Sequence, residues 1–137
     1  MAESEIVALA NAVVATIAGA ELAYAPDFGR LPEGVTKIFV APAEETVAVL
    51  DRGRNQVARK IAVLWARKIT NDAEIDPVLI ARETIRDTLF RKRLADQLCV
   101  AAELAPFYDS TLLREQKILA APLTLTFQSF AAAVAGS

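Results

Sequence analysis

Near the N-terminus the apolar positions follow a helical repeat. Between Ser4 and Gly19 they recur at steps of three and four residues, at Ile6, Leu9, Val13 and Ile17. Ser4 suits the N-cap of this helix, because its hydroxyl can accept a hydrogen bond from a free backbone N–H. Alanines widen the apolar stripe, so a sheet or a neighbouring subunit could pack closely against it. The pattern therefore predicts a helix over residues 4–19.

Turn-forming residues and short apolar runs come next. Residues 21–34 hold two prolines and two glycines, which predicts an irregular connector. A strand is predicted over residues 35–41, and we expect Pro42 to end it. Residues 46–50 are a second strand candidate, and residues 51–55 have the composition of a turn.

Residues 56–69 fit two periods. A strand would place Val57, Ile61, Val63 and Trp65 on one face. A helix would instead gather Val57, Ile61, Leu64, Trp65 and Ile69, so periodicity alone does not decide. The β-branched residues and the preceding turn favour a strand, which makes residues 46–69 a hairpin. We expect Trp65 to lie in the core.

Two helices are predicted in the second half of the chain. Asp76 and Pro77 suit the N-cap and the first position of a helix that runs to about Arg91. Its buried stripe is expected at Val78, Ala81, Ile85 and Leu89. Its water-facing side is expected at Arg82, Glu83, Arg86 and Asp87. A further helical segment is predicted through Leu94, Leu98 and Ala102, ending near Pro106.

The last predicted element is a half-exposed strand. Residues 111–119 are expected to form a turn or short helix, and residues 123–128 alternate between apolar and polar side chains. The order α-β-β-β-α-β follows. It predicts an α+β fold with one mostly antiparallel sheet, covered by two main helices, in a single domain over residues 1–137.

Composition excludes several kinds of chemistry. The chain has no histidine, so a Ser-His-Asp triad, a Cys-His dyad and a histidine-ligated zinc cannot be built within it. Its five glycines match no phosphate-binding loop. The acids at 72, 74 and 76 lack the rest of a calcium loop and are expected to form a solvated turn. We therefore expect no enzymatic activity, no cofactor and no metal.

The single cysteine and the longest apolar run bear on the cellular setting. Cys99 cannot form an internal disulfide, which favours a reducing compartment, and its apolar neighbours suggest a small buried side chain. The run from Ile6 to Ala20 contains Asn11 and follows two glutamates. It is too short for a spanning helix and lacks the positive start of a signal peptide, so we expect no membrane association.

Charge is distributed unevenly along the chain. Fifteen basic and seventeen acidic residues give a net charge of −2, but the segment from Arg52 to Lys68 holds six cations and no acid. These cations could be solvated, could meet acids on a neighbouring subunit, or could contact phosphates. A strand would alternate them between two faces, and Trp65 is its only aromatic side chain. No sequence-specific nucleic-acid binding is expected, and the candidate subunit-interface residues are Arg52, Arg54 and Arg59.

The pieces occur in a characteristic order. An N-terminal helix is followed by motifs at residues 24–28, 37–42, 50–54 and 60–65, a helix from Asp76 and a strand at 123–127. In spacing and hydrophobicity this order resembles the tail terminator, or tail-to-head joining, proteins of long-tailed bacteriophages. The alanine-rich end at residues 131–137 departs from that pattern.

The resemblance implies a structural protein of the virion. Such a protein is expected to form a ring, usually of six subunits, that caps the tail tube and ends its polymerisation. Its partners would be the tail tube protein and the head–tail connector. It would assemble in the host cytoplasm and reside at the neck of the virion. Rival interpretations are another head–tail completion or tube protein, and a small ligand-binding α/β regulatory domain.

Overall fold

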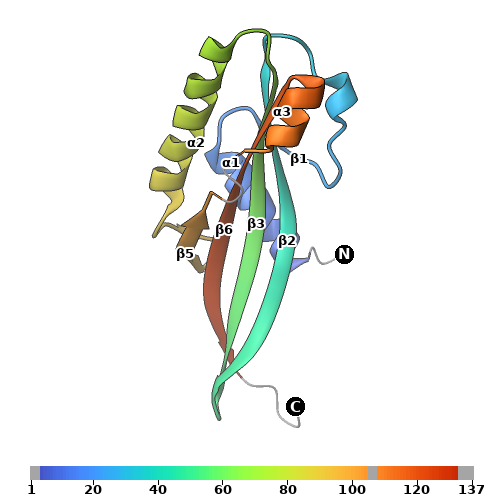
Figure 1. Ribbon diagram of the computed structural model, residues 1–137. Helices are drawn as coiled ribbons and strands as arrows, with labels where there is room; N and C mark the ends of the chain where they lie inside the picture. Colours follow the sequence, from blue (N-terminus) through green and yellow to red (C-terminus); the bar gives the residue numbers. More distant parts are fainter. Residues whose placement is uncertain (1–3, 105–107, 133–137) are drawn as a thin grey trace.

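The structure is a computed structural model that describes residues 4–104 and 108–132, with side chains as far as residue 129. Within these ranges the chain is an α+β protein built on one mixed, curled six-stranded sheet with three α-helices (Figure 1). The elements are α1 (Glu5–Thr16), β1 (Ala20–Leu22), η1 (Phe28–Arg30), β2 (Thr36–Asp51), β3 (Arg54–Lys68), η2 (Asp72–Glu74), α2 (Ile75–Leu89), β4 (Arg93–Leu94), β5 (Gln97–Glu103), α3 (Ser110–Gln116) and β6 (Ile118–Ala132). The predicted end of a helix near Pro106 and most of the alanine-rich end lie outside the described residues.

The strands follow the spatial order β1-β2-β3-β6-β5-β4. β1 runs parallel to β2, and the other four strand pairs are antiparallel. The predicted element order was incomplete, because it omitted β1, β4, β5 and α3. Two of the omitted strands have three residues or fewer, too short to show a period.

The helical segment predicted through Leu94, Leu98 and Ala102 was wrong. Ala95 and Asp96 have φ angles of 49° and 60°, the left-handed conformation of a two-residue hairpin turn. They join β4 to β5, in which Gln97 and Cys99 point into the protein. A four-residue apolar spacing therefore arose here across a turn and not along a helix.

β2 was predicted as two strands and is one strand of sixteen residues. Pro42 does not end it, because a register shift between Pro42 and Glu44 absorbs the proline. β1 pairs only with residues 38–40, so Pro42 lies on an open edge where a missing N–H breaks no ladder.

The strand interpretation of residues 56–69 is confirmed. β2 and β3 pair from Thr36↔Arg67 to Asp51↔Arg54, leaving Arg52 and Gly53 as the turn. The Asp51 carboxylate accepts a hydrogen bond from the Gly53 N–H at 2.9 Å, which closes the turn. Trp65 is 1% exposed and belongs to the core, as expected.

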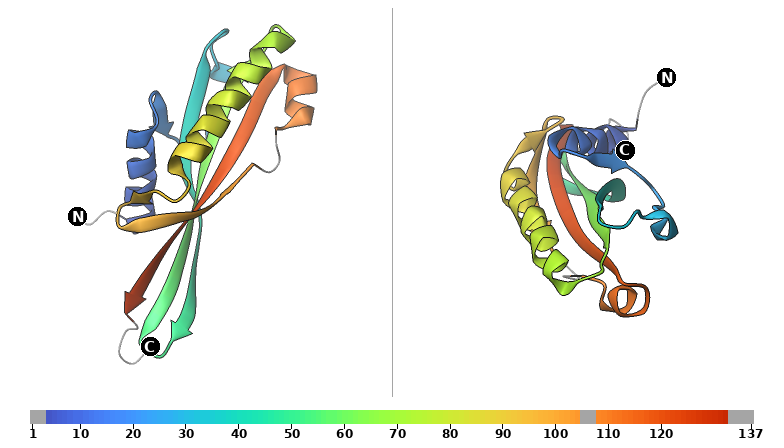
Figure 2. Two further views of the ribbon diagram at one scale, coloured as in Figure 1. Left: turned by 90° about the vertical axis from the view of Figure 1, so that its left-hand side faces the viewer. Right: turned by 90° about the horizontal axis from the view of Figure 1, so that it is seen from above.

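Most of the core lies on one face of the sheet. Helices α1 and α2 lie over that face (Figure 2), and their side chains pack against alternate residues of β3 and β6. A smaller cluster of Leu31, Phe39, Ala66 and Ile118 lies on the opposite face, where Phe28 of η1 and Leu112 of α3 cover it. Within the described residues no helix is long and apolar enough to cross a membrane.

α2 begins earlier and is rotated relative to the prediction. Asn71 and Glu74 form a capping box ahead of it, and Asp76 lies inside its first turn. Ala81 is exposed, whereas Arg82 is fully buried and donates from Nη1 to the Pro122 carbonyl at 3.1 Å. The expectation that Arg82 faces water was therefore wrong. Its long side chain reaches a backbone acceptor on β6 that the sequence does not reveal.

Three strands continue beyond the body of the molecule. β2, β3 and β6 extend together past the helices to the hairpin turn (Figures 1 and 2). We call this extension the arm and define it as residues 44–58 of the β2–β3 hairpin with residues 129–132 of β6. Arm residues Val57 and Arg54 pair with Ser129 and Ala132, so the arm is a three-stranded sheet.

Candidate interaction site on the projecting arm

The outer edge of the arm is formed by β2. In the part of the chain that the structure describes, no strand pairs with the free side of residues 44–50. An open strand edge presents unpaired backbone N–H and C=O groups, which can accept a further strand. Soluble proteins usually shield such an edge. The open edge is therefore a candidate for binding another chain.

Aliphatic side chains are exposed along the same edge. Val47 is 59% exposed, Val49 82% and Leu50 44%. Val47 lies opposite Val57 and Val49 opposite Asn55, on the face of the sheet that α1 covers nearer the body. Backbone groups and apolar side chains thus become available to a partner at the same place.

Two of the three predicted interface cations lie at the tip of the arm. Arg54 donates two hydrogen bonds to the Asp51 carboxylate, at 3.0 and 2.8 Å. This contact, followed by the Gly53 N–H, lowers the pKa of Asp51. Arg52 is exposed, and no ion pair to it occurs within the described residues. Arg52 is therefore the cation at the tip most available to a partner.

Arg59 does not join the cations at the tip. Its side chain is 8% exposed and forms ion pairs with Glu45 and Glu5, both at 2.5 Å. Its Nη1 donates to the Gln97 side-chain oxygen at 2.9 Å. The seven positions that separate Arg59 from Arg52 along the hairpin correspond to about 20 Å of strand. Arg59 therefore links the base of the arm to α1 and β5 within one chain.

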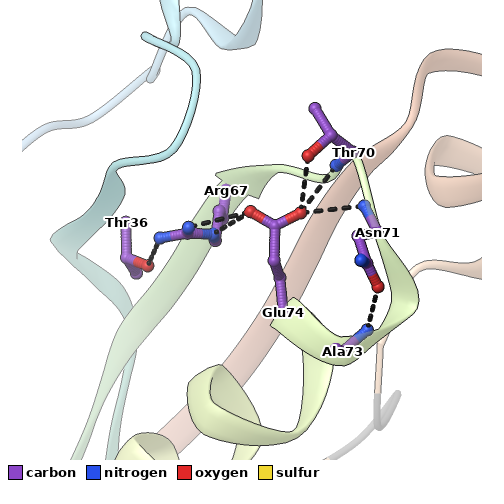
Figure 3. Close-up of polar contacts among 6 residues, drawn as sticks. All are labelled: Thr36, Arg67, Thr70, Asn71, Ala73 and Glu74. Carbon is purple, nitrogen blue, oxygen red and sulfur yellow. Dashed lines mark hydrogen bonds and ion pairs between the residues drawn. The ribbon is translucent and has the colours of Figure 1, made fainter.

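A second polar cluster lies at the other end of β3. The Glu74 carboxylate accepts hydrogen bonds from Arg67 on one side and from Thr70 and Asn71 on the other (Figure 3). Arg67 also donates to the Thr36 hydroxyl at 3.2 Å. Two cations of the predicted basic segment, Arg59 and Arg67, are thus neutralised inside the chain. The segment does not form one basic face.

Glu74 should make stability depend on pH in the acid range. Its hydrogen bonds, with Arg67 as the largest cause, lower its pKa from 4.5 to about 2. The ionised form therefore stabilises the folded state above about pH 4.5, and this contribution is lost as the pH falls toward 2. Glu74→Gln should be less stable than the wild type at pH 7, and urea titrations should show the gap closing on acidification.

Glu21→Gln is the matched control, because Glu21 is an exposed carboxylate on the short edge strand β1. Its stability should stay close to that of the wild type throughout the same titration. A gap for Glu74→Gln that is as large at pH 2 as at pH 7 would contradict the assignment.

Concavities occur at several places on the described part of the chain. One of about 400 Å³ lies between β2, β3 and α2, with Ile38, Trp65 and Val78 among its lining residues. Another, of about 270 Å³, lies beside α3 and includes Tyr108, Arg114 and Lys117. Across residues 4–104 and 108–132 no three potential ligands from His, Cys, Asp and Glu cluster as a metal site. Cys99 is buried, and burial is the main cause of its raised pKa.

Comparison with protein-family models and with curated proteins finds no match for this chain.

Proposed function

We propose that this protein is a structural subunit of a bacteriophage virion, which forms a ring on the end of the tail tube. In that role it stops tube polymerisation and offers a surface to the head–tail connector. The ring has six subunits, as the family resemblance implies. Assembly takes place in the host cytoplasm and the mature protein resides at the neck of the virion.

The arm is the observation that carries this proposal. It projects beyond the helices, has an unpaired edge and exposes Val47, Val49 and Leu50. A projection of this kind adds little to the core of its own chain and provides contact area for another. An assembly subunit needs such a surface, whereas an enzyme needs a cleft with convergent polar groups.

Charge supports a contact between unlike surfaces of neighbouring subunits. Arg52 and Arg54 lie at the tip. The exposed acids Asp72, in η2, and Asp76, in the first turn of α2, lie at the opposite end of the molecule (Figure 1). Contacts between two different surfaces of one chain generate rings when the rotation closes. The basic tip of one subunit meeting the acidic start of α2 on the next is such a contact.

Ring formation can be tested with purified protein and purified tail tubes. We expect a ring by negative-stain imaging and its mass by light scattering after size exclusion, and tubes that no longer elongate once capped. The double variant Arg52→Glu/Arg54→Glu should lower ring formation about tenfold or more, because it reverses both charges at the tip. Arg114→Glu, an exposed charge reversal on α3, should leave ring formation unchanged.

Other outcomes would favour the rival functions. Long tubes formed by this protein alone would identify a tube subunit. A strict monomer that forms no ring even beside tail tubes would contradict the proposal. A metabolite or nucleotide that clearly raises the melting temperature would indicate a ligand-binding domain.

A further inference from the structure

The residues along the open edge of β2 indicate which kind of strand can pair with it. Between its two register shifts, residues 44–49 form a regular stretch paired to β3 on one side only. Within this stretch Val47 and Val49 share one face and Ala48 points to the other. One end holds Glu44 and the other is followed by Arg52. Opposite charges at the two ends suit a strand that runs in the antiparallel direction.

We propose that two copies of the chain pair through their β2 edges, antiparallel, about a two-fold axis at Ala48. This register places Val47 of each copy opposite Val49 of the other on the same face. The four valines form one apolar cluster, and their exposed surface is removed from water. The three-stranded arms join into a continuous six-stranded sheet, and neither β2 edge remains open.

The same register brings Glu44 of each copy beside Arg52 of the other. Arg52 lies one residue past the second register shift, and its long side chain can span that offset. Glu45 comes near Asp51 of the partner, but each of these carboxylates is held by an arginine of its own chain, Arg59 and Arg54 respectively. Glu44 already has an exposed ion pair with Lys60 of its own chain, at 3.6 Å, and Arg52 of the other copy would join that pair. Two such charge clusters related by symmetry favour this register.

Neighbouring registers fit less well. Moving the axis to Val47 places Val49 opposite Glu45 of the other copy, and moving it to Thr46 places Val47 there. An axis between two residues would shift the pairing by one residue. It would place side chains of opposite faces opposite each other, so it is excluded for a two-fold pair. Among these, only the Ala48 axis places all four valines opposite one another and also an acid beside a base.

The pair is a form of the free chain, and it can exist whether or not the proposed ring forms. A contact over one short edge is small, so the dimer should dissociate on dilution. It uses the same arm that the ring needs, so it would keep the edge covered until a tail tube is available. Its failure and that of the ring are distinguishable, because the dimer is measured without tail tubes.

Cysteine cross-linking tests the register. Directly opposite residues of antiparallel strands have Cα atoms about 4.5–5.5 Å apart, within the range of a disulfide. Ala48→Cys should therefore form a disulfide-linked dimer under mild oxidation. Ala43→Cys, at another exposed position of the same strand, would lie about 34 Å from its counterpart and should not form one. Cys99 is buried, so the wild type should remain unlinked.

Light scattering of the free chain measures how charge reversals and a lysine substitution on the β2 edge change dimerisation. Glu44→Arg and Arg52→Glu should each weaken dimerisation, and the double exchange should restore it. Val49→Lys should abolish it without unfolding the chain, because this side chain is 82% exposed. A monomer at every concentration, equal cross-linking at positions 43 and 48, or a dimer that survives Val49→Lys would each overturn the proposal.

Discussion

Arg59→Ala should lower the free energy of unfolding by about 3 kcal/mol, which is the scale for breaking a buried ion pair. The variant loses three hydrogen bonds at once, because the guanidinium donates to Glu5, Glu45 and Gln97, and it also loses a buried side chain. Glu5 and Glu45 have side chains 80% and 42% exposed, so water can solvate them afterwards. This places the expected loss at the lower end of the usual range.

The physical consequence should be local as well as global. Arg59 is the point where α1, β2 and β5 are joined at the base of the arm, so its loss should also speed amide exchange in residues 44–58. Urea denaturation measures the global loss and hydrogen exchange the local one. The Arg59→Lys variant keeps one charge but not the planar fork, and should recover only part of the stability.

Arg54→Ala is the matched control for Arg59. Arg54 is also a β3 arginine in an ion pair, but its own side chain is 59% exposed and that of its partner Asp51 is 47% exposed. Exposed pairs contribute about 1 kcal/mol or less. Equal losses for Arg54→Ala and Arg59→Ala would show that burial does not distinguish the two pairs, and the role assigned to Arg59 would be incorrect.

Trp65→Ala should have the largest effect on stability, about 3–5 kcal/mol. The side chain is 1% exposed and belongs to the main core, where β3 packs beneath the helices. Trp65 is the largest fully buried side chain among the described residues, and its removal leaves a cavity that rigid neighbours cannot fill. The variant lacks the chain's only tryptophan, so its unfolding in urea should be followed by circular dichroism and not by tryptophan fluorescence.

Two further variants provide comparisons for the stability loss of Trp65→Ala. Trp65→Phe retains a ring and should lose about half as much or less, since loss scales with the cavity left behind. Tyr24→Ala removes an aromatic side chain that is 66% exposed and should stay within about 0.5 kcal/mol of the wild type. If Trp65→Ala unfolded no more readily than Tyr24→Ala, its place in the core would be in doubt.

The elements predicted well are those whose signals are local. The N-terminal helix shows a long, regular stripe, and the structure confirms a helix over Glu5–Thr16. It ends three residues before the predicted end, and Ser4 occupies the N-cap without the expected side-chain hydrogen bond. The hairpin has a turn sequence between two β-branched runs, and its turn lies at Arg52 and Gly53. The last strand alternates cleanly and is longer than predicted, Ile118–Ala132. In each case neighbouring residues in the sequence contain the physical cause.

The predictions that failed involve competition between local patterns and distant neighbours. Residues 94–102 have helical spacing, but residues 97–103 form a strand beside β6, in which the side chains of Gln97 and Cys99 are buried. Pro42 is a strand terminator by composition, yet an open edge and a register shift accommodate it. Arg82 is charged and was placed in water, but it reaches the Pro122 carbonyl across the core.

Some features of the candidate site also follow from local sequence, and others depend on tertiary structure. The sequence by itself determined the turn, the basic residues at its tip and the absence of histidine chemistry, because these depend on residue type and near neighbours. Only the tertiary structure decided that Arg59 is internal and that β2 has an open edge. Glu45 and Glu5 lie fourteen and fifty-four positions from Arg59 in the sequence, and folding brings all three together. Which strand lies at an edge is likewise set by how all six strands pair, and no single segment contains that information.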